Sequence, residues 1–307
     1  MSIKKILFKL LPFAIIFAIG YFFSQAIIEN WHSISKIDLQ PDVYSIAGTL
    51  FFLIAVIISG VLWGKLLSEL SGKKIGLNEA IKVHSASWLM KYIPGQAGSI
   101  LSKLAWAKSN GISQKSATNS FIYENVLLVL ASAVLALPVI VLFQGALSSD
   151  PSLLLPLLII IPISLVVYKP FFYKSLNFIF LKIGRKPFRE SDFLTSKQIL
   201  KFLSLYLLPR AMNGVAFVLI ALSFLPVESS MFVGLASIYI LASVVGLLAI
   251  FVPGGIGVRE AVIVLFASAY FPVDIAVLLS LIARFYATIA DIGVGITYLL
   301  MNKGRIS

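Results

Sequence analysis

The sequence predicts an all-α polytopic membrane protein, with about six full spans and two broken, re-entrant hairpins arranged as an inverted repeat. Three observations predict this fold: the apolar composition, the length of the apolar runs and the placement of the charges. Of the 307 residues, 59% are hydrophobic and 12% are charged, whereas soluble globular chains are about 45–50% apolar and about 25% charged. This composition excludes a single-core soluble enzyme and an intrinsically disordered chain.

Continuous apolar runs locate the spans, because about 18 or more apolar residues are enough to cross a bilayer. The first run follows three lysines, but it is longer than the apolar part of a signal peptide, which has about 7–15 residues. We therefore expect it to remain as a helix. Within the second run, Gly60-x-x-x-Gly64 is expected to serve helix packing rather than dimerisation. The expected full spans are 8–28, 43–64, 116–143, 152–168, 199–225 and 275–301.

Two further regions are interrupted by proline and glycine. Region 77–111 contains Pro94-Gly95, and region 231–271 contains Pro253-Gly254-Gly255. Proline and glycine end a helix, and backbone groups that are unpaired at membrane depth must face protein or a water-filled cavity. We expect each region to form a re-entrant hairpin, and a pair of broken helices is the alternative.

The charges set the topology, because Lys and Arg accumulate in cytoplasmic loops. With the N-terminus inside, most Lys and Arg fall in the predicted inner segments, and both termini are cytoplasmic. The expected location is the bacterial inner membrane. The basic segment 169–198 interleaves lysines with phenylalanines, so we expect an amphipathic cytoplasmic helix on anionic lipid and no nucleic acid. A basic loop without a specific ligand is the alternative. The predicted outer loops hold Lys36 and the acids Glu29, Asp38, Asp42, Asp150, Glu228 and Asp274.

The pattern Pro-Gly-x-x-Gly occurs twice, at 94–98 and at 253–257, which are 159 residues apart. The surroundings match, so a single transmembrane domain, 1–307, is predicted to contain two repeats. The first covers 43–143 with its hairpin at 77–111, and the second covers 199–301 with its hairpin at 231–271. Hairpins that open to opposite sides form an inverted repeat, which in transporters places the substrate site where broken helices meet. A structural kink between packed helices is the alternative.

Both motifs resemble the signatures of a known family. Residues 91–98 (Lys-Tyr-Ile-Pro-Gly-x-x-Gly) and 252–261 (Val-Pro-Gly-Gly-Ile-Gly-Val-Arg-Glu-Ala) resemble those of the lysylphosphatidylglycerol synthase transmembrane (flippase-like) family, over about residues 40–300. The resemblance implies a membrane domain that moves lipids or lipid-linked precursors between leaflets. Bifunctional members add a soluble C-terminal aminoacyl-transferase domain. This sequence ends just after its last expected span, so we expect a stand-alone member. The family often has Glu-Arg where this chain has Glu124-Asn125, so an arginine is missing there.

The helix that follows each break is predicted to bind a phosphate. Its first turn offers unpaired amides and the positive end of the helix dipole. Arg259 lies in the first turn after the second break, and arginine binds phosphate through two parallel hydrogen bonds. The glycines expected to contribute backbone are Gly95, Gly98, Gly254, Gly255 and Gly257.

Ionisable residues inside the expected spans complete the candidate site. Each costs at least about 2.5–3.5 kcal/mol at membrane depth, so pairing or function is expected. Counted along the helices, Glu124, Arg210 and Asp291 lie at similar depths and are expected to form a cluster, with Arg284 above it. A purely structural ion-pair network is the alternative. Glu260 is expected to bind a neighbour or a proton, and Lys103 is the remaining predicted substrate-binding residue.

These observations predict translocation of an anionic lipid, such as a phospholipid or a polyprenyl phosphate, by a protein that is not an enzyme. No cofactor or metal is expected, because the chain has no Cys and two His, and His84 is interpreted as a satisfied polar residue. The expected partners are membrane lipids with an anionic head group, and a glycosyltransferase or another lipid-modifying enzyme is the candidate protein partner. The alternatives are a secondary carrier of a small anion, a membrane glycosyltransferase, or a subunit of a lipid-modifying complex.

Overall fold

The computed structural model describes residues 40–92, 97–147, 169–182, 187–249 and 252–302, together with residues 24 and 28. These segments are helices joined by short loops, and they contain no strand, which confirms the predicted all-α class. The spans expected at 8–28 and 152–168 fall outside the described residues, apart from residues 24 and 28. Gly95 falls outside them as well.

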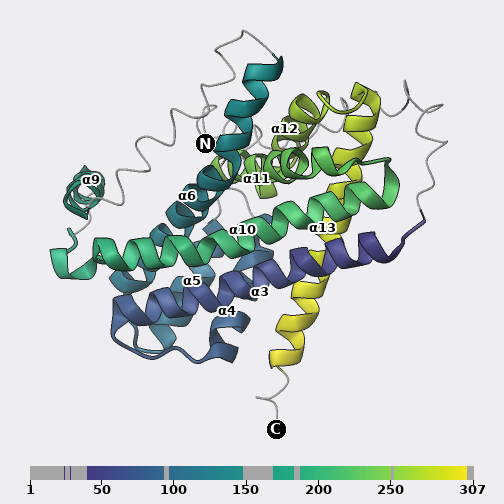
Figure 1. The fold of residues 1–307 in the computed structure, drawn as a ribbon. Coiled ribbons are helices and arrows are strands. Elements are labelled where there is room, and N and C mark those ends of the chain that lie inside the picture. The colour runs from purple at the N-terminus through teal and green to yellow at the C-terminus, as the bar shows by residue number, and fades with distance from the viewer. Residues whose placement is uncertain are drawn as a thin grey trace, which may run out of the picture.

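The described helices fall into two series with the same order: a long helix, a shorter helix, a break, a short helix and a long helix. In the sequence, the helix α9 (Lys169–Lys182) and the 3-10 turn η5 (Glu190–Asp192) separate the two series, and the 3-10 turn η6 (Ser229–Met231) precedes α11. Figure 1 shows the helices of both series. The first series is α3 (Val43–Ser71), α4 (Leu77–Leu89), η1 (Met90–Tyr92), α5 (Ala97–Ser109) and α6 (Gln114–Leu147). The second series is α10 (Ser196–Phe224), α11 (Phe232–Leu248), η7 (Pro253–Gly255), α12 (Val258–Ala267) and α13 (Val273–Asn302).

Helices α3 and α10 lie side by side along one face of the molecule (Figure 1). They run antiparallel, because Ser223 near the end of α10 donates a hydrogen bond to Asp42, which caps the start of α3 (2.6 Å). At the other end, Lys201 lies 3.7 Å from Glu69. A Cβ atom at Gly48 would lie 2.8 Å from the carbonyl oxygen of Ala216, so glycine permits this close approach. Each helix has 29 residues and is about 43 Å long, enough to cross a bilayer.

The packing of one series is matched by the packing of the other. Helix α4 contacts α3 and α13, and its counterpart α11 contacts α10 and α6. Helix α13 contacts α3, as α6 contacts α10, and the two breaks η1 and η7 contact each other. Exchanging the two series therefore leaves this pattern of contacts unchanged, as an internal repeat would. The repeat boundaries, and the side from which each hairpin opens, stay predictions.

Five helices in the described part of the chain are long and apolar enough to cross a membrane: α3, α6, α10, α11 and α13. Four of them occupy the spans expected at 43–64, 116–143, 199–225 and 275–301. The fifth, α11, was expected as one arm of a hairpin, yet it is long enough to cross alone. Helices α4 and α5 have 13 residues each and are about 20 Å long, too short to cross a core of about 30 Å. Whether the broken regions re-enter the membrane stays a prediction.

Small residues join α3 to α4, as expected for Gly60 and Gly64. A Cβ atom at Gly64 would lie 2.3 Å from Cβ of Ala80, and one at Gly60 would lie 3.0 Å from Cβ of His84. Contacts this short leave room only for hydrogen, so both glycines serve helix packing within the chain. The prediction for this motif is confirmed.

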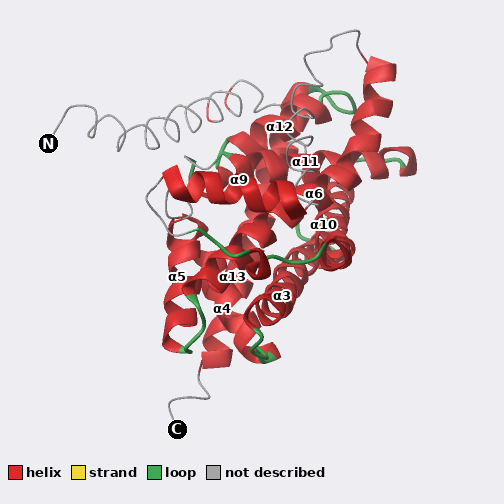
Figure 2. Cartoon of the chain, turned by 90° about the vertical axis from the view of Figure 1, so that its left-hand side faces the viewer, coloured by secondary structure: helices red, strands yellow, loops and turns green. Residues whose placement is uncertain are grey.

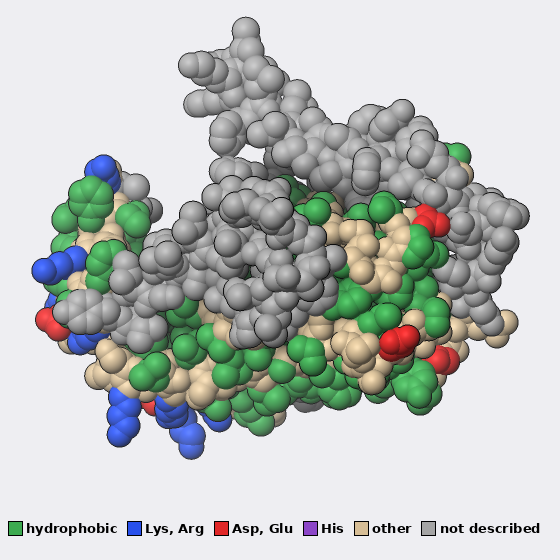
Figure 3. All heavy atoms as spheres, turned by 45° about the horizontal axis from the view of Figure 1, so that its top comes forward, with side chains coloured by type: hydrophobic (Ala, Val, Ile, Leu, Met, Phe, Trp, Pro, Cys, Tyr) green, Lys and Arg blue, Asp and Glu red, His purple; other side chains and the backbone are tan. Residues whose placement is uncertain are grey.

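Helix α9 lies at one end of the helical body (Figure 1), the end that faces the viewer in Figure 2. It carries both lysines and exposed apolar side chains. Phe172 and Leu176 are buried in a cluster that includes Phe193, whereas Phe178 and Ile179 are exposed. In Figure 3, Lys and Arg gather at the end of the molecule that holds α9, and Asp and Glu are the charges visible at the opposite end. The contact of α9 with lipid stays a prediction.

Candidate functional site

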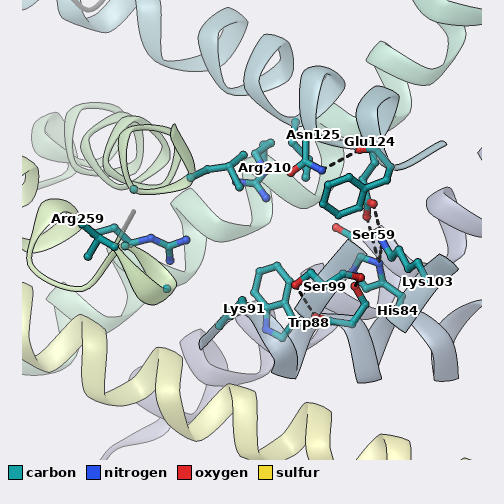
Figure 4. Close-up of a pocket in the computed structure, with 18 residues that line it drawn as sticks. Ser59, His84, Trp88, Lys91, Ser99, Lys103, Glu124, Asn125, Arg210 and Arg259 are labelled. Atoms are coloured by element: carbon teal, nitrogen blue, oxygen red, sulfur yellow. Dashed lines mark hydrogen bonds and ion pairs between the residues drawn. The ribbon is translucent and has the colours of Figure 1, made fainter. Parts of the chain in front are cut away.

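A buried cavity lies where the two breaks meet. Its volume is 90 Å³, and its walls come from α3, α4, α5 and α6 on one side and from α10, α11, η7 and α12 on the other (Figure 4). A second cavity of 40 Å³ shares Trp88, Lys91, Arg210 and Arg259 with the first and reaches Asp291 on α13. Both series therefore contribute polar side chains to one small space at their junction.

Arg259 enters the cavity from the first turn of α12, as the sequence predicted. Its Nε atom is buried and has no hydrogen-bond partner, and among the described residues no acid pairs with it. Gly246 on α11 makes room for it, because a Cβ atom there would lie 2.5 Å from Cγ of Arg259. Gly255 is also required: its φ is +66°, and a Cβ atom on it would lie 2.9 Å from Cα of Gly246. These two glycines let the broken helix fold back closely enough to place the guanidinium.

Arg210 reaches the same cavity from α10 and is 6% exposed. Its Nη1 donates a hydrogen bond to Ser243 Oγ at 3.1 Å, and its Nε has no partner. Asn125, which occupies the position where an arginine was expected from the family resemblance, lines the cavity too, and Figure 4 shows Arg210 beside it. The cavity therefore has an arginine from α10 near the position where the family resemblance led us to expect one on α6.

Asp291 binds a lysine rather than the expected Arg210. Its carboxylate lies 2.7 Å from Lys91 Nζ and accepts a hydrogen bond of 2.6 Å from Trp88 Nε1. Lys91 also lies 4.1 Å from the centre of the Trp88 ring, a cation–π contact. Arg210 thus lines one cavity with Glu124 and the adjoining cavity with Asp291, but among the described residues it forms an ion pair with neither. Because Lys91 belongs to η1 and Asp291 to α13, this ion pair joins the two series.

Glu124 is held within the first series, on the opposite wall of the cavity. Its Oε2 accepts a hydrogen bond of 2.5 Å from Lys103 Nζ, and its Oε1 lies 3.2 Å from His84 Nδ1. All three side chains are buried, and Lys103 Nζ lies 4.7 Å from the centre of the Trp63 ring. The sequence placed Lys103 in the site without a partner. The structure gives it a counter-charge that neutralises it.

Glu260 and Arg284 stabilise the second break instead of lining the cavity. Glu260 Oε2 accepts a hydrogen bond of 2.5 Å from the amide of Gly257, and its Oε1 lies 3.7 Å from Arg284 Nε. Arg284 Nη1 also donates to the carbonyl of Gly254 at 3.3 Å. The expectation that Glu260 binds a neighbour is confirmed. The expected place of Arg284, above a cluster with Asp291, is wrong because Glu260 holds it.

The glycines contribute less to anion binding than predicted. The amide of Gly255 donates to the carbonyl of Val252, and the amide of Gly257 caps α12 through Glu260. Neither amide is left for a phosphate, so that expectation is wrong for both residues. Gly254 and Gly255 line the cavity as backbone. Gly98 lies in the first turn of α5, next to Ser99, which lines the cavity.

The charges of the two cavities do not balance. Glu124 is used by Lys103 and Asp291 by Lys91, whereas no acid among the described residues pairs with Arg210 or Arg259. A buried cation without a counter-charge is costly, and an anion in the cavity would remove that cost. The arrangement is therefore suited to bind a small anionic group, such as a phosphate, between two guanidinium groups.

Sequence reasoning missed several residues of this site, chiefly His84, Lys91 and Gly246. Lys91 belongs to the first motif, but it was counted among the cytoplasmic charges. His84 was interpreted as a satisfied polar residue. This holds for Nδ1, which lies near Glu124 and Lys103, but the buried Nε2 has no hydrogen-bond partner among the described residues. Gly246 carries no local signal, since the side chain that needs it belongs to another helix.

A comparison with protein families agrees with the resemblance seen in the motifs. The family described as the lysylphosphatidylglycerol synthase TM region matches residues 9–295, nearly the whole chain. None of the curated proteins compared with the chain matches it. The family match and the apolar helices together indicate a multi-pass membrane protein with a lipid-related role.

Proposed function

Because the chain belongs to the lysylphosphatidylglycerol synthase transmembrane family, we propose that it moves an anionic lipid, or a lipid-linked precursor, between the leaflets of the bacterial inner membrane. The observation that carries the proposal is the pair Arg210 and Arg259, which face one cavity and have no acid partner among the described residues. In this proposal the protein is a transporter and performs no chemistry on its cargo.

The head group is held by side chains. Arg259 comes from the second break and Arg210 from the neighbouring long helix, so a phosphate between them receives charge-assisted hydrogen bonds from both. Such bonds contribute about 1.5–3 kcal/mol each. A cavity of 90 Å³ holds several water molecules and suits a phosphate group rather than a whole lipid. The acyl or prenyl tail therefore stays in the bilayer.

Alternating access requires the two series to move against each other, as repeats do in transporters. The ion pair between Lys91 and Asp291 spans the two series at 2.7 Å. It closes the smaller cavity on the side of α13, where both residues line the wall. We expect this contact to separate in one of the two access states.

Reconstitution into liposomes tests the proposal. Phosphatidylglycerol with a fluorescent label on an acyl chain is placed in both leaflets, and a membrane-impermeant quencher reports how fast inner-leaflet lipid reaches the outside. We expect the protein to accelerate this exchange, and accelerated release of entrapped glycerol phosphate without lipid exchange would instead support a carrier of small anions. Equal rates in protein-free liposomes would refute the proposal.

The inverted arrangement has its own test, because the chain contains no cysteine. Single cysteines at Ser109, which is exposed, and at Asp274, which is half-buried, are labelled in cells with an impermeant maleimide. We expect Asp274→Cys to react from the outside and Ser109→Cys only after the membrane is opened. Reaction of both from the same side would overturn the inverted topology and the cytoplasmic placement of the termini.

A further inference from the structure

Next to the two arginines lies a buried group that the proposed mechanism leaves unused: the imidazole of His84. We propose that His84 is a proton-binding site coupled to the anion site, so that the cavity takes up a proton together with the anion. The inference rests on the proposed function in one respect, which is that the cavity must bind an anion. Beyond that function, it names a proton as the ion that is transported together with the lipid.

The geometry around His84 leaves one of its two nitrogens without a hydrogen-bond partner among the described residues. Its Nδ1 lies 3.2 Å from Glu124 Oε1 and 3.3 Å from Lys103 Nζ, and its Nε2 has no partner among the described residues. A neutral imidazole can either donate to Glu124 or accept from Lys103 through Nδ1, and one nitrogen stays unsatisfied either way. Trp88 stacks on the ring and Gly60 packs against it, so the ring is held in place.

The neighbouring charges oppose a proton on His84 while the cavity is empty. Lys103 and Glu124 neutralise each other, and Lys91 neutralises Asp291 from α13. Burial of the ring and the neighbouring Lys103 disfavour a further cation on His84, and Arg210 and Arg259 add positive charge on the walls of the same cavity. Helix α3 adds no ionisable group to this wall, where it places Ser59, and on α4 itself Glu79 pairs with Lys82 at 2.7 Å.

An anion between the arginines reverses this balance. Its negative charge offsets the two guanidinium groups, so a proton from water can bind the imidazole, with Nδ1–H donating to Glu124. By linkage, each ligand then raises the affinity for the other by the same factor. A phosphodiester lipid and a proton together carry no net charge, which lowers the cost of moving the head group through the bilayer. The transport step would then respond to a pH gradient more than to the membrane potential.

Calorimetry measures the proton directly. Dihexanoyl phosphatidylglycerol is titrated into the purified protein at about pH 6.5, the ordinary midpoint of histidine, in two buffers with different ionisation enthalpies. Its phosphodiester does not titrate there, unlike a phosphate monoester, so a difference in heat reports a proton taken up by the protein. We expect proton uptake on lipid binding, and none for His84→Gln. The matched control is His32→Gln, which changes the other histidine of the chain and should behave as wild type.

The outcomes separate the two proposals. If the binding heat is the same in both buffers, the coupling is overturned and the anion site stands. If His84→Gln takes up as many protons as the wild type, the coupling to His84 is likewise overturned and the anion site stands. Absence of binding heat overturns the anion site and the coupling together. If His84→Gln does not fold, the His32→Gln protein decides, because His84 is then its only histidine. Its ¹⁵N imidazole signals should show a larger protonated fraction when the lipid is added at constant pH, and no change would refute the coupling.

Discussion

The two walls of the cavity handle buried charge in opposite ways. On the wall built by the first series, Lys103 and Glu124 are 2.5 Å apart, so the cation has a carboxylate of its own. On the wall built by the second series, Arg210 has Ser243 and Arg259 has no acid among the residues described. The charge on the first wall is therefore neutralised within the protein, whereas in the proposed function a ligand supplies the missing negative charge on the second wall. Under this proposal, buried cations stabilise the fold on one side and bind the anion on the other.

Glu124→Gln should have the largest effect on stability, because it leaves Lys103 buried without a counter-charge. Breaking a buried pair costs about 3–5 kcal/mol, so we expect a clearly lower melting temperature in detergent. The double variant Glu124→Gln with Lys103→Met should recover much of the loss. Strictly additive losses in the double variant would show that the two residues do not stabilise each other.

Arg259→Gln should do the reverse, lowering transport without lowering stability. The lost interaction with the anion is worth about 1.5–3 kcal/mol, so lipid exchange should fall by about ten-fold or more, with expression and melting unchanged. Arg259→Lys keeps the charge but not the paired geometry and should retain part of the rate. Arg189→Gln is the matched control, because Arg189 is exposed and lies in the loop before α10. A stable Arg259→Gln protein with normal exchange would remove this residue from the mechanism.

Gly246→Ala tests whether the second wall depends on the path of the Arg259 side chain. The new Cβ would lie 2.5 Å from Cγ of Arg259, so the side chain or the break must shift. Overpacking of this kind costs about 1–3 kcal/mol, and we expect a smaller loss of exchange than for Arg259→Gln. In the combined variant Gly246→Ala with Arg259→Ala, the alanine at 246 should have less effect on melting, because the side chain at 259 then has no Cγ to meet. An equal effect in both backgrounds would place the clash elsewhere.

Ser243→Ala should have the smallest effect, and it should depend on ligand. Arg210 loses a hydrogen bond worth about 1 kcal/mol, which lowers the melting temperature slightly. Dihexanoyl phosphatidylglycerol should restore much of this loss, because the anion replaces the hydroxyl as the partner of Arg210. The neutral lipid dihexanoyl phosphatidylcholine serves as the reference. If both lipids stabilised the variant equally, Arg210 would not be an anion ligand.

The long helices could be predicted from the sequence because their signal is local. An apolar run located α3 from residue 43, but the expected end at 64 falls short of Ser71, since Lys65 and Glu69 continue the same helix beyond the apolar stretch. The two Pro-Gly breaks were also recognisable, and η7 forms at the second one. What these features share is that every residue needed for the inference lies within a few turns.

The partners inside the site could not be predicted, because depth along one helix does not tell which side chains meet. Lys91 and Asp291 are 200 residues apart, and Lys91 was assigned to a cytoplasmic segment. Glu124 was matched with Arg210 by depth, whereas α5 brings Lys103 to it from the first break. That Arg259 faces the cavity was predictable from its position after the break. Its lack of an acidic partner was visible only in three dimensions.

The spacing of these ion pairs along the chain has a consequence for synthesis of the protein. Lys103 and Glu124 are 21 residues apart, so their pair can form as soon as the first series has left the ribosome. Lys91 must wait for Asp291, 200 residues later, and at about 5–20 residues per second that delay is roughly 10–40 s. During this interval the nascent first series has its own neutral pair, whereas the ion pair between Lys91 and Asp291 has not yet formed. We expect nascent chains arrested before α13 to be cleaved near Lys91 by added protease, and longer chains to be protected there.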